Sequence, residues 1–125
     1  MAERYSSFKP GGRGWLFQRL TAAFLVVVLA FHFLMRHFFF HADEVTFGQS
    51  AAFMAEWGYY GTMILFLITA TYHGVNGVYN ALVNQGLEGT PRKAVKWVLI
   101  VASLLLIAQG IRLAEALRTA GVGGA

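Results

Sequence analysis

Cysteine is absent from the 125 residues of the chain. A protein without cysteine forms no disulfides and supplies no thiolate ligands to zinc or to an iron–sulfur cluster. Any iron–sulfur cluster that works together with this chain must therefore belong to another polypeptide.

Charged residues are also scarce, at 13% of the chain against 57% hydrophobic residues. This composition is too apolar for an ordinary soluble protein of this length. The hydrophobic residues form three segments, each long enough to cross a hydrocarbon core of about 30 Å as a helix. A soluble core of this size could not enclose three helices that are apolar on every side. We therefore predict an all-α integral membrane protein, with a single transmembrane domain over 1–125 and helices at about 15–40, 55–85 and 93–118.

The charges that are present predict an orientation. The charged residues of the first connection are all acidic, whereas basic residues lie before the first helix and in the second connection. Because positively charged connections stay in the cytoplasm, we expect a cytoplasmic arm at 1–14 and a cytoplasmic turn at 86–94. The C-terminus would then lie outside the plasma membrane of a prokaryotic cell. The net charge of +4 reflects this topology, so nucleic acid is not an expected partner.

The second hydrophobic segment contains one stripe of polar and small residues. Asn76, Gly77, Asn80 and Asn84 follow His73 at intervals that place them on a single helix face. Polar groups facing lipid are costly, so this stripe should face protein, a cavity or a cofactor. The small residues beside His73 would let a flat ligand such as a porphyrin approach, and helix packing alone would also account for the stripe.

The first segment has a corresponding stripe. Gln18 and Thr21 share a helix face with His32, and Arg19 lies beside that face at the cytoplasmic end. A guanidinium there can pair with carboxylates or with a quinone carbonyl, or it can simply extend to the lipid headgroups. His37 and His41 lie on the opposite face, and we interpret them as histidines at the membrane interface.

The depths of the two histidines differ. His32 lies about 25 Å along the first helix from Trp15, and His73 lies about 24 Å along the second helix from Trp57, which runs in the opposite direction. In a core of roughly 30 Å the two imidazoles are near opposite faces, so they cannot ligate the same iron. If both are ligands, they serve two separate metal centres, and each centre takes its other axial ligand from another chain.

Two stretches of the sequence together resemble a known family. QRLTAAFLVVVLAFH at 18–32 and YHGVNGVYNALVNQG at 72–86 are similar to the membrane anchors of succinate:quinone oxidoreductases and fumarate reductases. In the two-haem form, the second half of the anchor opens with Gln-Arg-x-Thr and has a histidine fourteen residues after the glutamine, the interval from Gln18 to His32. A later histidine precedes x-x-Asn-Gly, an aromatic residue and a glycine-rich turn. The corresponding residues are His73, Asn76, Gly77, Tyr79 and Gly86.

One-haem anchors of this family often have an Arg-His pair after the Asn-Gly and a later aspartate. This chain has Tyr79, Asn80 and Asn84 at those places, which favours the two-haem form.

The resemblance implies a set of ligands. His73 would be an axial ligand of the haem b nearer the cytoplasm and His32 of the distal haem b. Gln18 and Arg19 would lie near the propionates of the inner haem, with Asn76 and Gly77 beside it.

The resemblance also implies partners. A second small membrane anchor would supply the opposite histidines, a flavoprotein would oxidise succinate, and an iron–sulfur subunit would pass electrons to the membrane and to quinone. The chain would be a subunit of succinate dehydrogenase in the respiratory chain and tricarboxylic acid cycle, with no activity alone.

Two other functions fit the same residues. A haem-free anchor or assembly scaffold would use both stripes for helix packing only. A proton conduit would use His32, His73 and the asparagines as a relay.

Overall fold

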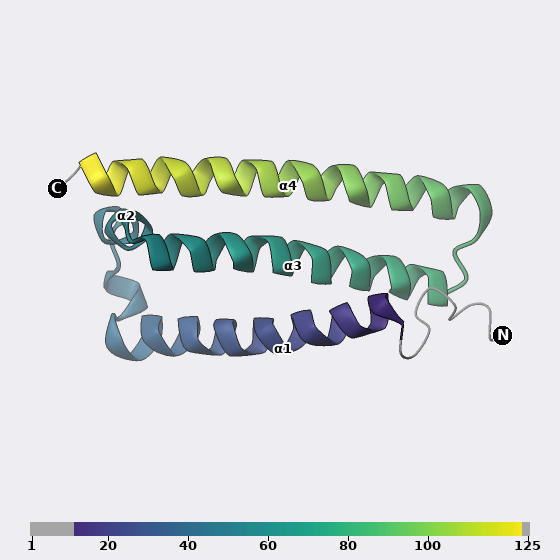
Figure 1. Cartoon of the computed structure of the whole chain (residues 1–125), viewed down its shortest axis with the longest axis horizontal. Coiled ribbons are helices and arrows are strands. Elements are labelled where there is room, and N and C mark those ends of the chain that lie inside the picture. Colours follow the sequence, from purple (N-terminus) through teal and green to yellow (C-terminus); the bar gives the residue numbers. More distant parts are fainter. Residues whose placement is uncertain (1–11, 124–125) are drawn as a thin grey trace.

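The computed structural model describes residues 12–123, which form helices and no strand. In chain order the helices are α1 (Arg13–Leu34), the π-helix η2 (Met35–Phe39), the 3-10 helix η3 (Ala42–Glu44), α2 (Phe47–Ala55), α3 (Trp57–Asn84) and α4 (Gly89–Gly123). The three long helices lie in a row with α3 in the middle (Figure 1). The prediction of an all-α fold is confirmed.

The first predicted helix, at 15–40, corresponds to α1 together with η2. Of the predicted arm at 1–14, residues 1–11 lie outside the described part, and Arg13 and Gly14 already belong to α1. Both α1 with η2 and α4 are long and apolar enough to cross a membrane singly. The remaining pair, α2 and α3, meets the same test together but is bent by 96°.

This bend separates a short helix from the second predicted span. The span predicted at 55–85 corresponds to α3, which begins at Trp57. Before it, α2 starts with a capping box in which Thr46 Oγ1 accepts from the Gln49 N–H at 3.2 Å and Gln49 Oε1 accepts from the Thr46 N–H at 2.9 Å. Glu56 then has extended backbone angles and ends α2. As a result α2 lies across the end of the long helices (Figure 1).

The last helix is longer than the predicted 93–118 at both ends. Pro91 lies in its first turn, where a missing N–H costs no helical hydrogen bond. At the other end α4 packs against α2 so closely that a Cβ added to Gly121 would overlap the carbonyl group of Ala51. Packing against α2 therefore supports α4 beyond the predicted end.

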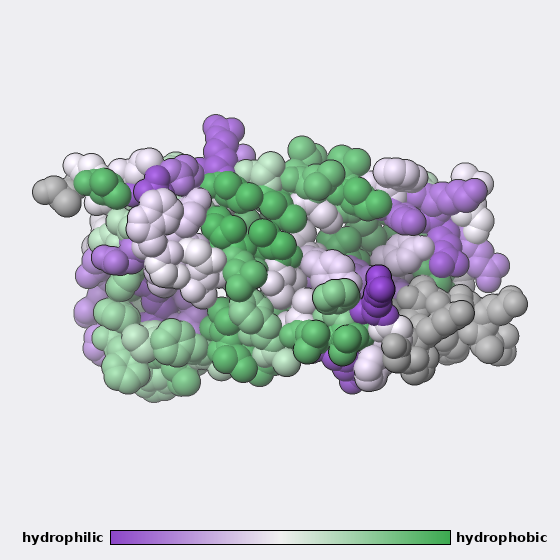
Figure 2. Space-filling view, viewed as in Figure 1, coloured by the Kyte–Doolittle hydropathy of each residue, from purple (hydrophilic) through white to green (hydrophobic). Residues whose placement is uncertain are grey.

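Very little of the described chain is buried. Its buried hydrophobic residues are Ala51, Met54, Val83 and Ala114. Large hydrophobic side chains on α1 and α4 are exposed instead, such as Val26 at 68% and Leu105 at 66%. In Figure 2 hydrophobic residues cover most of the middle of the molecule, and hydrophilic residues gather nearer its two ends. These exposed surfaces suit contact with lipid and with other membrane helices.

Candidate functional site

His73 is held in place by a hydroxyl group from the neighbouring helix. Its Nδ1 lies 3.0 Å from Thr21 Oγ1, and the Thr21 hydroxyl is 2.7 Å from the carbonyl oxygen of Phe17, to which it donates. Because that bond uses the only hydroxyl proton, the imidazole donates from Nδ1 to the Thr21 oxygen. In the neutral imidazole with this tautomer, Nε2 has a lone pair available for a metal ion.

A glutamine from α1 joins the same group of residues. Gln18 Nε2 donates to the backbone carbonyl of His73 at 3.3 Å, and Gln18 Oε1 accepts from Asn76 Nδ2 at 2.8 Å. Asn76 in turn accepts from Asn80 Nδ2, through its carbonyl oxygen at 2.7 Å and its Oδ1 at 3.2 Å. The polar stripe of α3 therefore faces α1 over these residues, which fits the expectation that it faces protein and not lipid.

The two glycines beside His73 have different surroundings. A Cβ at Gly77 would lie 3.4 Å from Gln18 Nε2, so the space that Gly77 leaves is occupied by the Gln18 side chain. Gly74 has no atom within 4 Å of such a Cβ. Open space next to the histidine is therefore at Gly74, while Gly77 serves the contact between α1 and α3.

Arg19 does not reach His73 in the single chain. It is exposed on α1, and its guanidinium carbon lies 4.9 Å from the centre of the Trp15 ring. Stacking on Trp15 leaves its charge at the end of α1 that carries the N-terminus.

His32 lies at the other end of the α1–α3 pair, beside a separate cavity. The cavity has a volume of about 350 Å³ and is lined by side chains from α1, η2, α2 and α3, among them His32, Arg36, Phe53 and Tyr59. A volume of roughly 300–1,000 Å³ is typical of small-ligand sites. The His32 and Tyr59 rings are 6.5 Å apart between centres.

The two histidines are too far apart to share an iron. His73 contacts Thr21, and His32 follows Thr21 by eleven positions along the same helix. At about 1.5 Å per residue this is a separation of ~16 Å. The structure therefore has two candidate centres at different levels along α1: His73 with Thr21 toward the end where α1 begins, and His32 with its cavity toward the other end.

Several residues near these centres were not predicted from the sequence. Arg36 and Tyr59 border the cavity of His32 and are joined by a hydrogen bond of 2.9 Å from Arg36 Nη2 to the Tyr59 hydroxyl. Arg36 follows His32 by four residues, and residues four apart lie on the same face of a helix. This interval could have placed Arg36 beside His32 from the sequence. Thr21 was predicted on the face of Gln18 and His32, but its contact with His73 depends on how α1 and α3 pack.

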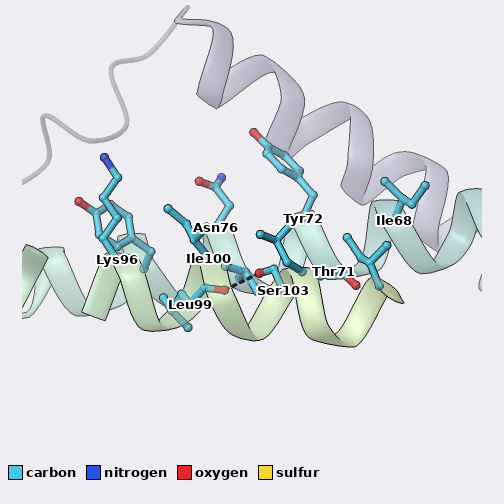
Figure 3. Close-up of a pocket in the computed structure, with 12 residues that line it drawn as sticks. Ile68, Thr71, Tyr72, Asn76, Lys96, Leu99, Ile100 and Ser103 are labelled. Carbon is cyan, nitrogen blue, oxygen red and sulfur yellow. Dashed lines mark hydrogen bonds between the residues drawn. The ribbon is translucent and has the colours of Figure 1, made fainter. Parts of the chain in front are cut away.

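A hydrophobic groove lies between α3 and α4. It encloses about 490 Å³, and aliphatic side chains line it together with polar ones such as Asn76, Tyr79 and Lys96. Figure 3 shows Lys96 at one end of the groove, and it shows the Ser103 hydroxyl bonded to its own helix, where it donates to Leu99 O at 2.6 Å. The Tyr79 hydroxyl accepts from Arg92 Nε at 3.0 Å, so its own proton is free for another acceptor.

Within residues 12–123 no group of three or more His, Cys, Asp or Glu side chains could hold a metal ion. His37 and His41 are both exposed. A cofactor that takes one imidazole from this chain and another from a partner fits the donors that are present, and haem is such a cofactor.

Comparison with known proteins supports this picture. The sequence matches the family of succinate dehydrogenase/fumarate reductase transmembrane subunits over residues 2–109. The chain belongs to this family. No curated protein and no solved structure matches the chain significantly.

Membership in this family confirms the resemblance found in the two histidine stretches. The transmembrane subunit is a multi-pass membrane protein and a non-catalytic part of succinate dehydrogenase or fumarate reductase. It associates with other subunits of that enzyme in the membrane. Its exposed helix faces are consistent with such an assembly, because they leave the bundle incomplete.

Proposed function

We propose that this subunit anchors a succinate:quinone oxidoreductase and provides one axial ligand to each of two haems b. His73 would ligate the inner haem and His32 the outer one, and a second small anchor subunit would supply the opposite histidines. When bound, haem b would supply one-electron carriers between the iron–sulfur subunit and quinone. The observation that carries this proposal is the bond from His73 Nδ1 to Thr21, because it leaves Nε2 free for iron.

The other residues of this chain would orient the ligands. Gln18 and Asn76 fix the spacing of α1 and α3 around His73 through their bond of 2.8 Å. Arg19 is next to Gln18 and exposed at the end of α1, where its cation could pair with a propionate of the inner haem.

The groove between α3 and α4 is the region that best suits quinone. Its aliphatic walls would hold the ring and tail, and Tyr79 has a free proton to donate to a quinone carbonyl. Replacing Tyr79 with Phe should raise the KM for quinone and leave the haem spectrum unchanged. An unaltered KM would exclude this position.

We further propose an orientation with the N-terminus and the turn between α3 and α4 in the cytoplasm. The chain does not begin α4 until Gly89, and Arg92, Lys93 and Lys96 follow within its first two turns. Such a cluster of basic residues at a helix end is typical of the cytoplasmic side. The inner haem level at His73 would then be nearer the iron–sulfur subunit.

Single substitutions in the assembled complex test the two ligands. His73→Ala and His32→Ala should each remove one haem signal from the reduced-minus-oxidised spectrum, and His37→Ala is the control because His37 is exposed on the same segment as His32. Complexes would be compared only where all subunits copurify. Two unchanged haem signals in an assembled His73→Ala complex would rule out the role of that residue.

A haem-free anchor remains the second candidate, because one observation favours it. The Gln18, Asn76 and His73 contacts satisfy several polar groups between α1 and α3 without any cofactor. A purified complex with no absorption in the haem Soret region would support this function and exclude the first.

A further inference from the structure

Arg36 is an unusual charge for its position in the molecule. It belongs to η2, which continues the first membrane-spanning helix, and its side chain is half-buried. Its Nη1 is buried and has no hydrogen-bond partner among the described residues. A buried donor of a charged group without a partner is costly, so such a group in a native protein calls for an explanation.

The guanidinium is held inside the structure by contacts from two other helices. Its Nη2 donates to the Tyr59 hydroxyl of α3 at 2.9 Å, and its Cζ lies 4.5 Å from the centre of the Phe53 ring of α2. An arginine that only served the membrane surface would extend its head toward the headgroups. Arg36 is instead directed between α2 and α3.

No carboxylate of the described chain neutralises this charge. The ion pair found within residues 12–123 is Arg118 with Glu115, on α4. Asp43, Glu44 and Glu56 are exposed in the connections around α2 and form no ion pair with Arg36. A half-buried charge beside lipid is stabilised by an anion, and with no carboxylate of the described chain paired to Arg36 such an anion would come from outside the chain.

The position of Arg36 indicates which anion this is. Arg36 and His32 line the same cavity of about 350 Å³. Arg36 follows His32 by four residues, so it lies about one helical turn nearer the outer end. A ligand bound through His32 would therefore have Arg36 on its outer side, within the same cavity.

We propose that Arg36 binds a carboxylate of the haem that His32 ligates, and that Tyr59 positions Arg36 for this contact. The proposal rests on the proposed function, because it requires a haem at the outer level. It makes the outer site a combination of an iron ligand and a carboxylate anchor, one turn apart on the same stretch of helix.

The test measures the midpoint potential of each haem in the purified complex. Ferric haem carries one more positive charge than ferrous haem, so a nearby cation raises the potential. Arg36→Gln should lower the midpoint potential of the outer haem only. For this one-electron couple, a shift of ~59 mV corresponds to a tenfold change in the oxidised-to-reduced ratio at a fixed potential. Arg36→Lys keeps the charge, so it should keep most of the wild-type potential. In Arg36→Gln, the propionate-bending band of the outer haem in resonance Raman spectra should also shift.

The chain provides a matched control. Arg92 also bonds a tyrosine hydroxyl, from Nε to Tyr79 at 3.0 Å, and its Cζ lies 5.8 Å from that ring. It is on α4 at the opposite end of the molecule, so Arg92→Gln should leave the outer haem potential unchanged. Should Arg36→Gln prevent assembly, Tyr59→Phe is a milder change that should lower the same potential by a smaller amount.

Other results would overturn the inference. Unchanged potential and Raman bands in an Arg36→Gln complex that retains both haems would exclude the haem carboxylate. If Arg36→Gln loses a copurifying anionic phospholipid and the outer haem potential does not change, Arg36 binds a lipid phosphate. If Arg36→Gln loses only the second anchor subunit, Arg36 binds a carboxylate of that partner. A wild-type complex without haem would refute the proposed function itself. This result differs from a failure of the Arg36 proposal alone, in which both haems are present.

Discussion

The hydroxyl of Thr21 decides which nitrogen of His73 is available. Thr21 Oγ1 donates to its own helix at Phe17 O and accepts from His73 Nδ1. Metal-bound histidines commonly donate their second ring nitrogen in this way, and such partners fix both the ring orientation and the tautomer. Thr21 would therefore support the proposed centre at His73 although it would not touch iron.

We predict that Thr21→Val weakens haem binding at the inner site. Valine has nearly the shape of threonine but cannot accept from Nδ1, so the imidazole loses its fixed tautomer. Loss of such a supporting contact typically costs about 10- to 100-fold in metal affinity. The rate of haem loss from the purified complex, followed in the Soret band, measures this effect.

Thr119→Val is the control for this change. Thr119 is exposed on α4, and its hydroxyl donates to Glu115 O of the same helix at 3.0 Å. Equal rates of haem loss in both variants would contradict a role for Thr21 at His73.

The sequence predicted part of the site at this scale. The stripe of His73, Asn76 and Gly77 could be found because helical spacing alone places these residues on one face. Its contacts with Gln18 could not be assigned, because they depend on the rotation of α1 against α3. For the same reason Gly77 was interpreted as space for a cofactor, whereas the structure fills that space with Gln18.

Among the helices, α2 is the one that shapes the end of the molecule that holds His32. It lies at 96° to α3 and packs against the last turns of α4. Through Phe53 it also contributes to the cavity of His32. A helix that connects two spans therefore also forms a wall of the proposed outer site.

We predict that Gly121→Ala loosens the packing of α2 on α4. The added methyl group would overlap the Ala51 carbonyl, and overpacking typically costs about 1–3 kcal/mol. A loss of this size makes local opening about 5- to 150-fold more frequent. The rate of proteolysis in the connection at 41–56, measured on the complex in native membranes, reports this opening.

Gly123→Ala provides the comparison, since a Cβ at Gly123 has no atom within 4 Å. It is two residues away on the same helix and changes the composition identically. Similar proteolysis rates for both variants would show that the close contact with Ala51 does not hold α2 in place.

The long helices were predictable, but α2 was not. Hydrophobic length identifies spans, and both α1 with η2 and α3 lie within a few residues of their predicted bounds. The predicted span at 55–85 already begins near the break at Glu56, but α2 before it has nine residues, too few for hydropathy to identify as a span. The one local sign was the pair Thr46 and Gln49, which forms the capping box at the start of α2.

The molecule as a whole is a row of three long helices with exposed apolar sides. Helix α3 is in contact with both α1 and α4, and it carries His73 toward α1 while Tyr79 lines the groove on the side of α4. The small buried core means that the chain gains little stability from burial within itself. Its apolar faces are therefore suited to lipid and to the other membrane subunits of the enzyme.

We predict the orientation of the molecule from its charges and test it by labelling introduced cysteines. The chain has no cysteine of its own, so each introduced thiol is the only one that it carries. With a membrane-impermeant maleimide on intact cells, Ala42→Cys should be labelled, because η3 is at the outer end. Glu88→Cys, in the turn between α3 and α4, should be labelled only after the membrane is opened.

Both positions are exposed in the structure, so a difference in labelling reports sidedness and not burial. If Glu88→Cys is labelled on intact cells and Ala42→Cys is not, the basic turn lies outside the cell. His73 would then be nearer the outer face of the membrane than the cytoplasmic face.

The central claim is that this anchor supports two haems b, one near each membrane face. Haem content and the electron paramagnetic resonance spectrum of the purified complex test it most directly. We predict two haems b per copy of the chain, both low-spin with two histidine ligands, one of which disappears in His73→Ala. A complex that contains all its subunits and no haem would contradict the account.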